Sequence, residues 1–230
     1  MSIALVVGAG SGLSASLARA LAARGHDVVL AARDTSDLSG LQGEIEATAI
    51  RCDAREPNEV AQLFGRVDAM EGDLAVAVYN PSARVRGPVH ELDPAAVENA
   101  IMVTTFGAFL MAHHATKRML AAGSGALLFT GASAGVKGFA NSSSFAMGKF
   151  GLRGLCQSLA RELHPHNIHV GHFVIDGGIS TTPRRNGAGQ RAPDDTLDPD
   201  AIAGAYMHFL DQHRSAWAWE IELRPWVEAF

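Results

Sequence analysis

The chain has 230 residues, of which 47% are hydrophobic, and a formal net charge of -5 at pH 7. This length and composition are typical of one globular domain with a well-filled core. The mild acidity gives no reason to expect nucleic acid or an anionic membrane surface as a partner. We find no uninterrupted apolar span typical of a membrane helix and no secretory signal, so we expect a cytoplasmic protein. Cys52 and Cys156 are far apart in the chain, and we expect both to be reduced packing residues.

Short apolar segments alternate with amphipathic ones along nearly the whole chain. In chain order, strands are predicted at Ile3–Val7, Asp27–Ala31, Ala47–Cys52, Leu74–Tyr79, Ala126–Thr130, His169–Ile175 and Ala218–Leu223. Helices are predicted at Leu13–Arg24, Asn58–Ala69, Pro94–Ala121, Ser144–Leu163 and Pro199–His213. Continuous rather than alternating apolar strands are typical of a parallel sheet covered on both faces, so we predict a single α/β domain over residues 1–230.

One long irregular stretch, Thr181–Asp198, interrupts this alternation and is rich in Gly, Pro, Arg and Asp. A segment of this kind beside a site usually acts as a binding loop or lid. We therefore predict a substrate or lid loop at residues 181–198. Nearby histidines do not suggest a metal site, because His169 and His172 stand three apart in a strand and point to opposite faces, so no metal is expected.

Three glycines, Gly8, Gly10 and Gly12, lie between the first predicted strand and the first predicted helix. Ser11 and Leu13 stand on either side of Gly12 and are assigned to the same loop. Glycines at this place let the chain turn tightly and bring backbone N–H groups close to a diphosphate, whose charge the helix N-terminus favours. This loop predicts the site of a dinucleotide cofactor. The alternative interpretation is a tight strand-to-helix turn with no ligand.

Two residues at the ends of the next strands bear on which cofactor is bound. Arg33 stands where an acidic residue is expected if the protein holds a free ribose 2′-hydroxyl. A guanidinium there suits a 2′-phosphate, so we favour NADP(H) over NAD(H), with a solvated surface arginine as the alternative. Asp53 follows the third strand and is a candidate to accept a hydrogen bond from the adenine amino group, or else a turn or capping carboxylate.

A series of motifs in a fixed order resembles the short-chain dehydrogenase/reductase family over almost the whole chain. The motifs are Gly8-x-x-x-Gly12-x-Ser14, Arg33, Cys-Asp53, Tyr-Asn80-Pro-Ser, Val103-Thr-Thr-Phe-Gly107, Thr130-Gly-Ala-Ser-Ala-Gly135, Lys149 and Asp-Gly177-Gly-Ile179-Ser-Thr181. The resemblance implies one Rossmann-like, doubly wound parallel sheet of about seven strands, and homodimers or homotetramers packed through the two long helices. It also implies that Asn80 borders the cofactor, and that Ile179 and Thr181 hold the nicotinamide amide and the diphosphate.

The chain departs from this family where the chemistry is expected. The resemblance implies a catalytic Tyr, Lys, Ser and Asn, and the corresponding residues here are Phe145, Lys149, Ala132 and Thr104. No Tyr-x-x-x-Lys pair exists anywhere in the chain. Lys149 is expected to bind the nicotinamide ribose. Losing the tyrosine and serine hydroxyls together predicts a more apolar pocket and a small, less polar carbonyl substrate.

Other groups are open candidates for the missing proton donor. Ser133 follows the lost serine position directly, and Asp176 replaces a proline near where the nicotinamide is expected. Lys149 itself becomes an acid if burial lowers its pKa. Ser144 is a poor substitute, because it is rotated by about 140° from Lys149 around the helix.

Three functions remain open. The first is an NADP(H)-dependent oxidoreductase of the short-chain type with an altered proton route. The second is an NADP(H)-binding sensor or partner subunit without turnover. The third is a lyase or isomerase on the same fold that uses Asp176 or Lys149 for acid-base chemistry.

Overall fold

The computed structural model describes residues 2–180 and 195–228. Within these residues, seven strands form one parallel sheet in the order β3-β2-β1-β4-β5-β6-β7. The strands are β1 (Ser2–Val7), β2 (His26–Ala32), β3 (Thr48–Arg51), β4 (Asp73–Tyr79), β5 (Gly125–Thr130), β6 (Ile168–Ile175) and β7 (Glu220–Leu223). All seven correspond to predicted strands, although β7 begins two residues later than the predicted Ala218.

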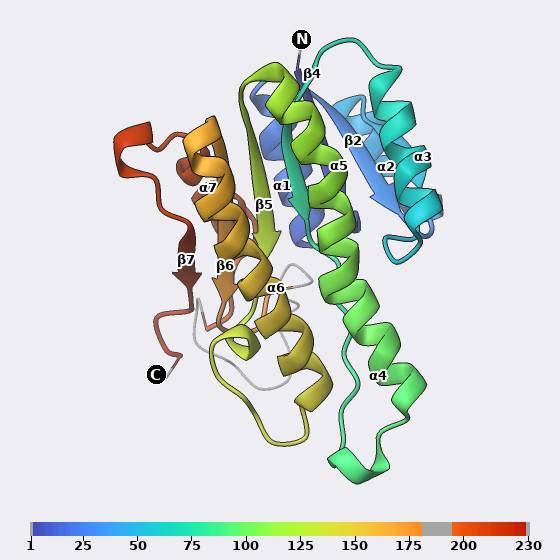
Figure 1. Cartoon of the computed structure of the whole chain (residues 1–230), viewed down its shortest axis with the longest axis vertical. Coiled ribbons are helices and arrows are strands. Elements are labelled where there is room, and N and C mark those ends of the chain that lie inside the picture. Colours follow the sequence, from blue (N-terminus) through green and yellow to red (C-terminus); the bar gives the residue numbers. More distant parts are fainter. Residues whose placement is uncertain (1, 181–194, 229–230) are drawn as a thin grey trace.

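Helices cover both faces of this sheet, as the continuous apolar strands predicted (Figure 1). Side chains of α3 (Pro57–Asp68), α5 (Gly107–Ala122) and α6 (Ser143–Leu163) share one core with the sheet. Side chains of α1 (Leu13–Ala23), α2 (Ser39–Ile45) and α7 (Pro199–Leu210) share the other. Cys52 and Cys156 are buried and form no disulfide, as predicted.

The helix predicted over Pro94–Ala121 is present and extends to Ala122, but it contains a π-helical turn that was not predicted. The structure has α4 (Pro94–Ile101), a π-helical turn (Met102–Phe106) and α5. Gly107 follows the turn and packs so tightly that a Cβ there would lie 2.3 Å from the Tyr79 hydroxyl. The apolar periodicity of the sequence runs unbroken through the π-helical turn, so it does not indicate this tertiary contact.

Two smaller predictions also differ from the structure. Helix α2 was not predicted, because Gly40 and Gly43 interrupt its short apolar pattern. Helix α7 ends at Leu210 rather than at the predicted His213, which instead caps a short 3-10 turn over Arg214–Ala216 through its ring nitrogen.

The run Pro94–Ala122 is long and apolar enough to cross a membrane by length and composition alone. In the fold, α5 packs against β4, β5 and α3. Its buried side chains, among them Met111, Ala115 and Met119, belong to the core on that face of the sheet. The apolar character of this run therefore has a structural explanation within the domain.

Candidate functional site

Two cavities lie along the edge of the sheet where the parallel strands end. The first, of about 520 Å³, opens over the ends of β1, β2 and β3, and we call it the Arg33 cavity. The second, of about 730 Å³, opens over the ends of β4, β5 and β6, and we call it the Lys149 cavity. Ser82 lines both. The carboxyl edge of the sheet thus offers two adjoining compartments, which suits an extended ligand with two distinct ends.

The glycine loop lies between the two cavities. Gly8 has φ +82°, and a Cβ there would lie 2.7 Å from Pro81, so only glycine fits. At Gly10 and Gly12 an added Cβ would meet nothing within 4 Å, so the loop faces open space there. No side chain caps α1 at Gly12. The predicted residues from Gly8 to Leu13 therefore form an open cradle at a helix N-terminus, which fits a diphosphate.

Ser14 ties this loop to the end of β4. Its hydroxyl donates to the Gly8 carbonyl (2.7 Å) and accepts a hydrogen bond from Asn80 Nδ2 (2.6 Å). Asn80 also donates its backbone N–H to the Val7 carbonyl (3.0 Å). A glycine at position 14 would lack both side-chain contacts, so the serine stabilises the loop instead of displacing it. Asn80 and Leu13 both line the Lys149 cavity, as expected of residues that border a cofactor.

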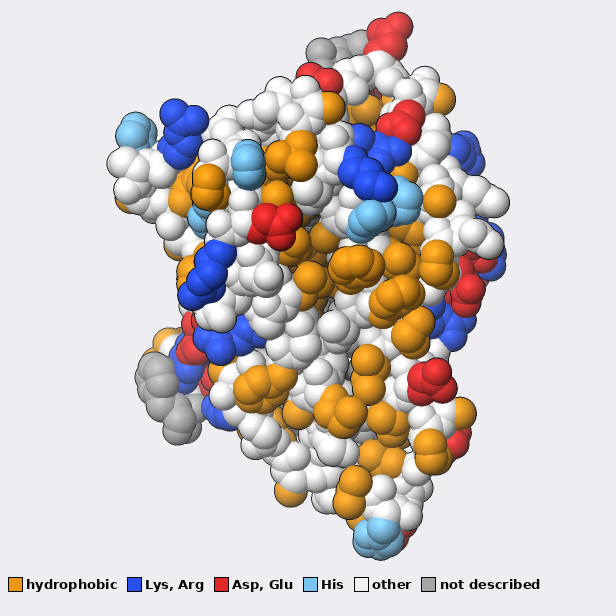
Figure 2. Space-filling view, in the orientation of Figure 1, with side chains coloured by type: hydrophobic (Ala, Val, Ile, Leu, Met, Phe, Trp, Pro, Cys, Tyr) orange, Lys and Arg blue, Asp and Glu red, His pale blue; other side chains and the backbone are white. Residues whose placement is uncertain are grey.

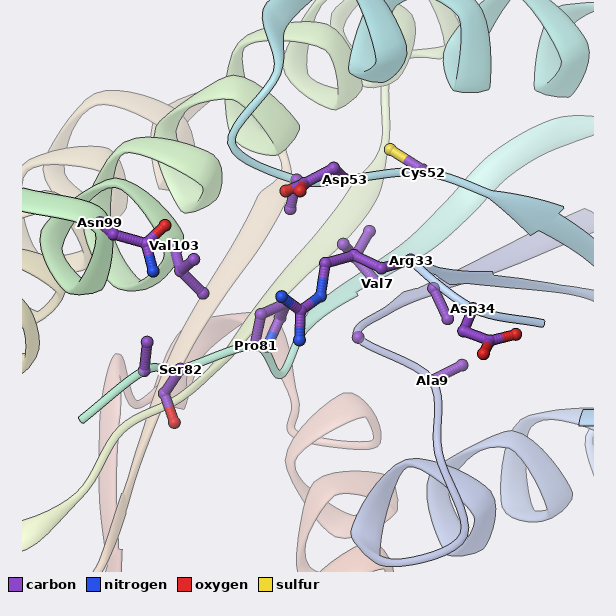
Figure 3. Close-up of a pocket in the computed structure, with 14 residues that line it drawn as sticks. Val7, Ala9, Arg33, Asp34, Cys52, Asp53, Pro81, Ser82, Asn99 and Val103 are labelled. Atoms are coloured by element: carbon purple, nitrogen blue, oxygen red, sulfur yellow. The ribbon is translucent and has the colours of Figure 1, made fainter. Parts of the chain in front are cut away.

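Arg33 directly follows β2 and lines the cavity named after it. Figure 3 shows its guanidinium reaching across the cavity toward Pro81, while Asp34 points away. Asp34 accepts a hydrogen bond from the Ser36 N–H (2.9 Å). No carboxylate among the described residues forms an ion pair with Arg33. An exposed guanidinium without a protein counter-charge is the type of group that binds a phosphate.

Asp53 lines the same cavity and performs the turn role that was one of its two interpretations. Its carboxylate accepts from the backbone N–H of Arg55 (3.1 Å) and from the Arg55 guanidinium (2.7 Å). These contacts hold the pKa of Asp53 below its usual value, and the hydrogen bond from the Arg55 side chain is the largest cause. Arg55 also donates to Asn99 of α4, which faces the cavity. The adenine contact stays a prediction.

Lys149 lies on α6 and is buried, with 2% of its surface exposed. Its ammonium donates to the carbonyl of Thr130 at the end of β5 (2.7 Å). The pKa of Lys149 is lowered to about 7, chiefly by burial and also by the nearby Arg84, whereas Cys156 opposes the shift. A lysine with this pKa exchanges its proton near neutral pH, which an ordinary surface lysine does not.

Phe145, Ala132 and Ser133 line the cavity around Lys149. The Lys149 Nζ lies 5.8 Å from the centre of the Phe145 ring. Ala132 lies after the end of β5 and has an extended backbone, and Ser133 begins a short 3-10 turn. The Ser133 hydroxyl forms no hydrogen bond with the described residues. Ser133 therefore keeps its standing as a candidate donor. Lys149, Phe145, Ala132 and Ser133 thus line one cavity.

Thr104 does not line either cavity. It is buried in the π-helical turn, and its hydroxyl accepts a hydrogen bond from the Ala83 N–H (3.1 Å). Ser144 is likewise buried and bonds the backbone of Val85. Both hydroxyls therefore hold the chain segment after β4 in place and do not face the site.

Asp176 follows β6 and lines the Lys149 cavity. Its Oδ2 atom lies 3.2 Å from Arg224 and 3.6 Å from Lys137. The expected carboxyl group is thus present, but it is engaged with two cations. This makes Lys149 the better-supported candidate for proton transfer.

Ile179 also lines this cavity and pairs with Leu197 in an isolated bridge. Two backbone hydrogen bonds, from Ser180 N to Leu197 O and from Leu197 N to Gly178 O, reinforce it (both 2.8 Å). The predicted loop at 181–198 therefore leaves and rejoins the fold beside the cavity. Thr181 and residues 182–194 lie outside the described residues.

The comparisons with known proteins identify the family. The family model for short chain dehydrogenase matches residues 2–191. This chain belongs to the short-chain dehydrogenase family. The cis-4-hydroxycyclohexanecarboxylate dehydrogenase of Sinomonas cyclohexanicum is 36% identical over 186 residues, covering 79% of this chain and 74% of the relative. The 3-oxoacyl-(acyl-carrier-protein) reductase MabA of Mycobacterium tuberculosis is 29% identical over 181 residues, covering 79% and 70%.

Solved structures of short-chain dehydrogenases share the fold. One from Rhodopseudomonas palustris has a TM-score of 0.85 and 34% identity, covering 98% of this chain and 99% of that one. A metagenomic short-chain oxidoreductase in complex with NADP has a TM-score of 0.82 and 27% identity, covering 98% of each chain. The predicted Rossmann-like parallel sheet is confirmed. The family is one of oxidoreductases that bind NAD(P).

Neither tyrosine of this short-chain dehydrogenase reaches the site. The Tyr79 hydroxyl donates to the Val103 carbonyl, and the Tyr206 hydroxyl shares a hydrogen bond with Thr130 Oγ1 (2.8 Å). Both side chains are fully buried, and neither lines a cavity described above. The chain itself therefore supplies no phenol beside Lys149.

The sequence analysis missed a group of charged residues in the Lys149 cavity. Arg84 and Arg86 line it from the segment after β4, and Lys137 lines it from the turn after β5. One signal was available in the sequence, because two arginines at alternate positions follow Asn80-Pro-Ser directly. The cavity is consequently less apolar than the loss of two hydroxyls suggested.

The two histidines of β6 point away from each other. His169 stacks on Phe209 and Trp217, whereas the His172 ring bonds Glu220 (2.9 Å), so the two side chains point to opposite faces as predicted. Burial lowers the pKa of both to about 4. Among residues 2–180 and 195–228 there is no group of three or more metal-ligating side chains.

Proposed function

We propose that this chain is an NADP(H)-dependent oxidoreductase that interconverts a small, mainly apolar carbonyl compound and its alcohol without a tyrosine. One observation carries the proposal. A buried lysine with a pKa of about 7 lines the cavity, and the side chains beside it, Phe145 and Ala132, can neither donate nor accept a proton. The glycine cradle, the fold and the family support a nicotinamide dinucleotide as cofactor.

The assignment of NADP(H) over NAD(H) depends on Arg33. Its guanidinium has no ion-pair partner among the described residues and reaches into the cavity at the end of β2 (Figure 3). A 2′-phosphate placed there would complete its hydrogen bonds, whereas a 2′-hydroxyl would not neutralise it. We assign Gly8 through Leu13 to the diphosphate, and Asn80, Lys149, Ile179 and Thr181 to the nicotinamide half.

The proton route follows from the surroundings of Lys149. Bound NADP(H) supplies or accepts the hydride. Lys149 holds the proton on Nζ, and the Thr130 carbonyl fixes the direction of one N–H. With a pKa near 7, Lys149 donates to a substrate oxygen in reduction and takes the proton back in oxidation. Ser133 lines the same cavity and is a candidate to hydrogen-bond the same oxygen.

The walls around Lys149 favour an apolar substrate body. A carbonyl oxygen directed at Phe145 or Ala132 would find no donor there and would lose its hydrogen bonds to water. The oxygen is therefore best placed toward Lys149, with the carbon skeleton on the Phe145 ring. A flat or cyclic skeleton would gain most from that contact.

We also propose a homo-oligomer, a dimer or a tetramer, built through α5 and α6. Figure 2 shows apolar side chains gathered on this face. Three large side chains on the two helices are strongly exposed: Phe109 at 46%, Met147 at 54% and Phe150 at 44%. Exposed apolar residues grouped in this way are typical of an interface. Light scattering on the purified protein would measure the assembly, and a monomer would contradict it.

A second candidate function is an NADP(H)-binding protein without turnover. Phe145 favours it, because the ring fills the space next to Lys149 and is itself covered by Arg84 at 4.0 Å. A ring held in this way could close the site to a substrate.

Single-turnover kinetics separate the two candidates. The protein is first titrated with NADPH and NADH, then loaded with NADPH and mixed with a panel of aldehydes, ketones, imines and activated alkenes. Oxidation of bound NADPH by a member of the panel supports the oxidoreductase. Tight binding with no oxidation by any member supports the second candidate, and no binding of either dinucleotide contradicts both.

A further inference from the structure

Two arginines stand on the wall of the Lys149 cavity without an assigned role. Arg84 and Arg86 both belong to the segment that follows β4. The backbone N–H groups of the residues between and beside them donate hydrogen bonds to other segments of the chain. Ala83 N donates to Thr104 Oγ1 (3.1 Å), Val85 N donates to Ser144 Oγ (3.0 Å), and Gly87 N donates to the Asn141 carbonyl (3.1 Å).

This alternation sets where the arginines point. In an extended segment, successive residues face opposite sides. Ser82, Arg84 and Arg86 line the cavity, whereas the intervening Ala83 and Val85 do not, so the side chains at 84 and 86 face it. The Ser144 hydroxyl also donates back to the Val85 carbonyl (2.8 Å), so this anchor is double. The two guanidinium groups are thus presented to the cavity by a fixed backbone.

The Arg84 side chain is held further by Phe145. Its Cζ atom lies 4.0 Å from the centre of the phenyl ring, a distance typical of a cation–π contact. Lys149 Nζ lies 5.8 Å from the same ring centre. Phe145 therefore forms an apolar platform with a guanidinium against it and the proposed proton donor nearby.

Arg84 and Arg86 add positive charge to this wall, and two carboxylates, Asp176 and Glu228, line the same cavity. No carboxylate among the described residues forms an ion pair with Arg84 or Arg86. Asp176, which lines the same cavity, is already engaged with Lys137 and Arg224. Partial burial and the neighbouring Arg86 hold the pKa of Arg84 below its usual value, although a guanidinium stays charged. Arg84 and Arg86 are both exposed where they line the cavity, and two neighbouring cations favour binding of an anion there.

We propose that Arg84 and Arg86 bind a carboxylate of the substrate, so that the substrate class is a small oxo or hydroxy acid with an apolar body. This proposal depends on the proposed function, because it places the carboxylate and the reacting carbonyl at two ends of one molecule. The guanidinium fork matches a planar carboxylate through paired hydrogen bonds. The apolar body lies on Phe145, and the carbonyl faces Lys149.

Binding of matched charged and neutral probes tests this proposal. Benzoate and benzamide share the ring and the size of the polar group but differ in charge. Their affinities are measured by calorimetry on the full chain, both saturated with NADP+ and free of dinucleotide. We expect benzoate to bind about tenfold more tightly than benzamide, and this preference to weaken as salt is raised.

Three variants locate the source of the preference. In Arg84→Gln and in Arg86→Gln, we expect benzoate affinity to fall about tenfold, with benzamide and NADP+ affinities unchanged. Arg84→Lys keeps the charge and should restore part of the benzoate affinity. Arg66→Gln, an exposed arginine on α3 without an ion pair, makes the same charge change away from the cavity and should alter nothing.

The outcomes separate this proposal from the proposed function. Equal binding of benzoate and benzamide, or a benzoate preference that survives Arg84→Gln and Arg86→Gln, overturns the carboxylate site. Loss of NADP+ affinity in these variants also overturns it and assigns the arginines to the cofactor. If wild-type protein binds no dinucleotide, the proposed function fails. A benzoate preference carried by Arg84 on the free protein would then stand as anion binding unrelated to redox chemistry, and the substrate assignment would fall.

Discussion

The Arg33 cavity and the Lys149 cavity lie on the same edge of one sheet, yet they differ in how they are built. The Arg33 cavity and the glycine loop beside it depend on backbone geometry, above all on the positive φ of Gly8 and on its contact with Pro81. The Lys149 cavity depends on side chains, among them Phe145 and Ala132, which stand where the resemblance to the family implies hydroxyls. We therefore expect dinucleotide binding and chemistry on a substrate to be separable in this protein.

This difference teaches how one fold can keep a cofactor and change its reaction. Backbone sites tolerate few substitutions, since any Cβ at Gly8 collides with Pro81. Side-chain sites can exchange one proton carrier for another without disturbing the sheet. In this protein we propose Lys149, which is buried in the cavity with a pKa near 7, as the proton carrier.

The largest expected effect comes from restoring the hydroxyls of the Lys149 cavity. The double change Ala132→Ser with Phe145→Tyr should raise the rate of carbonyl reduction by ~100-fold, because a positioned general acid contributes at least that much. Stopped-flow measurement of NADPH oxidation checks it, with each single change as a control. An unchanged or lower rate in the double variant would show that the cavity is reshaped beyond these two groups.

Next in size is the effect of a side chain at Gly8. Gly8→Ala should lower the free energy of unfolding by roughly 1–3 kcal/mol, because it forces a strained φ and a contact with Pro81, and it should weaken dinucleotide binding. Thermal unfolding and calorimetric titration with NADPH measure the two effects.

Gly10→Ala is the matched control for this pair of measurements. Its Cβ would meet nothing within 4 Å in the protein, so its stability should change by no more than ~0.5 kcal/mol. The new methyl group faces the proposed diphosphate position, so NADPH affinity should still fall. Equal loss of stability in Gly8→Ala and Gly10→Ala would contradict the distinction.

The pKa of Lys149 predicts how stability depends on pH. Because the folded pKa of about 7 lies below the unfolded value, the unfolded chain binds more protons between these values, and stability rises as pH increases above 7. Between pH 7 and 8.5 the slope should approach ~1.4 kcal/mol per pH unit, or about 2 kcal/mol in all. Urea unfolding of wild type and Lys149→Met measures it, and the rise should be absent from the variant. Parallel curves for the two proteins would rule out the lowered pKa.

The smallest expected effect is at Arg33. Arg33→Gln should weaken NADPH binding by about tenfold, equal to ~1.4 kcal/mol, and leave NADH binding unchanged, because only the contact with the 2′-phosphate is lost. Titration of both dinucleotides checks it, with Arg66→Gln as the charge-matched control. A similar loss for both dinucleotides would show that Arg33 does not read the 2′-phosphate.

The sequence predicted the elements that depend on local pattern. All seven strands follow from short apolar runs, and the glycine loop follows from its place between β1 and α1. It did not predict features that depend on contacts between distant segments. The π-helical turn and the close packing of Gly107 on Tyr79 join α5 to β4, and no periodicity in the sequence records them.

The site shows the same division. Lys149, Phe145, Ala132 and Ser133 are brought together as their positions in the motifs implied. The anchoring of Val85 by Ser144, between the two arginines that line the cavity, joins residues 59 positions apart in the chain. Such a contact appears only in the folded structure. The sequence consequently predicted an apolar cavity, and the structure adds a charged wall to it.

The pH dependence of a single turnover tests the central claim most directly, namely that Lys149 carries the proton where the chain has no tyrosine. Protein loaded with NADPH is mixed with 4-carboxybenzaldehyde, and the rate of NADPH oxidation is measured from pH 6 to 9 in wild type and in Lys149→Met. The account predicts that the wild-type rate falls about tenfold per pH unit above a midpoint near 7, and that Lys149→Met reacts at least ~100-fold more slowly without this fall. A rate that is independent of pH, or one that Lys149→Met retains, would contradict it.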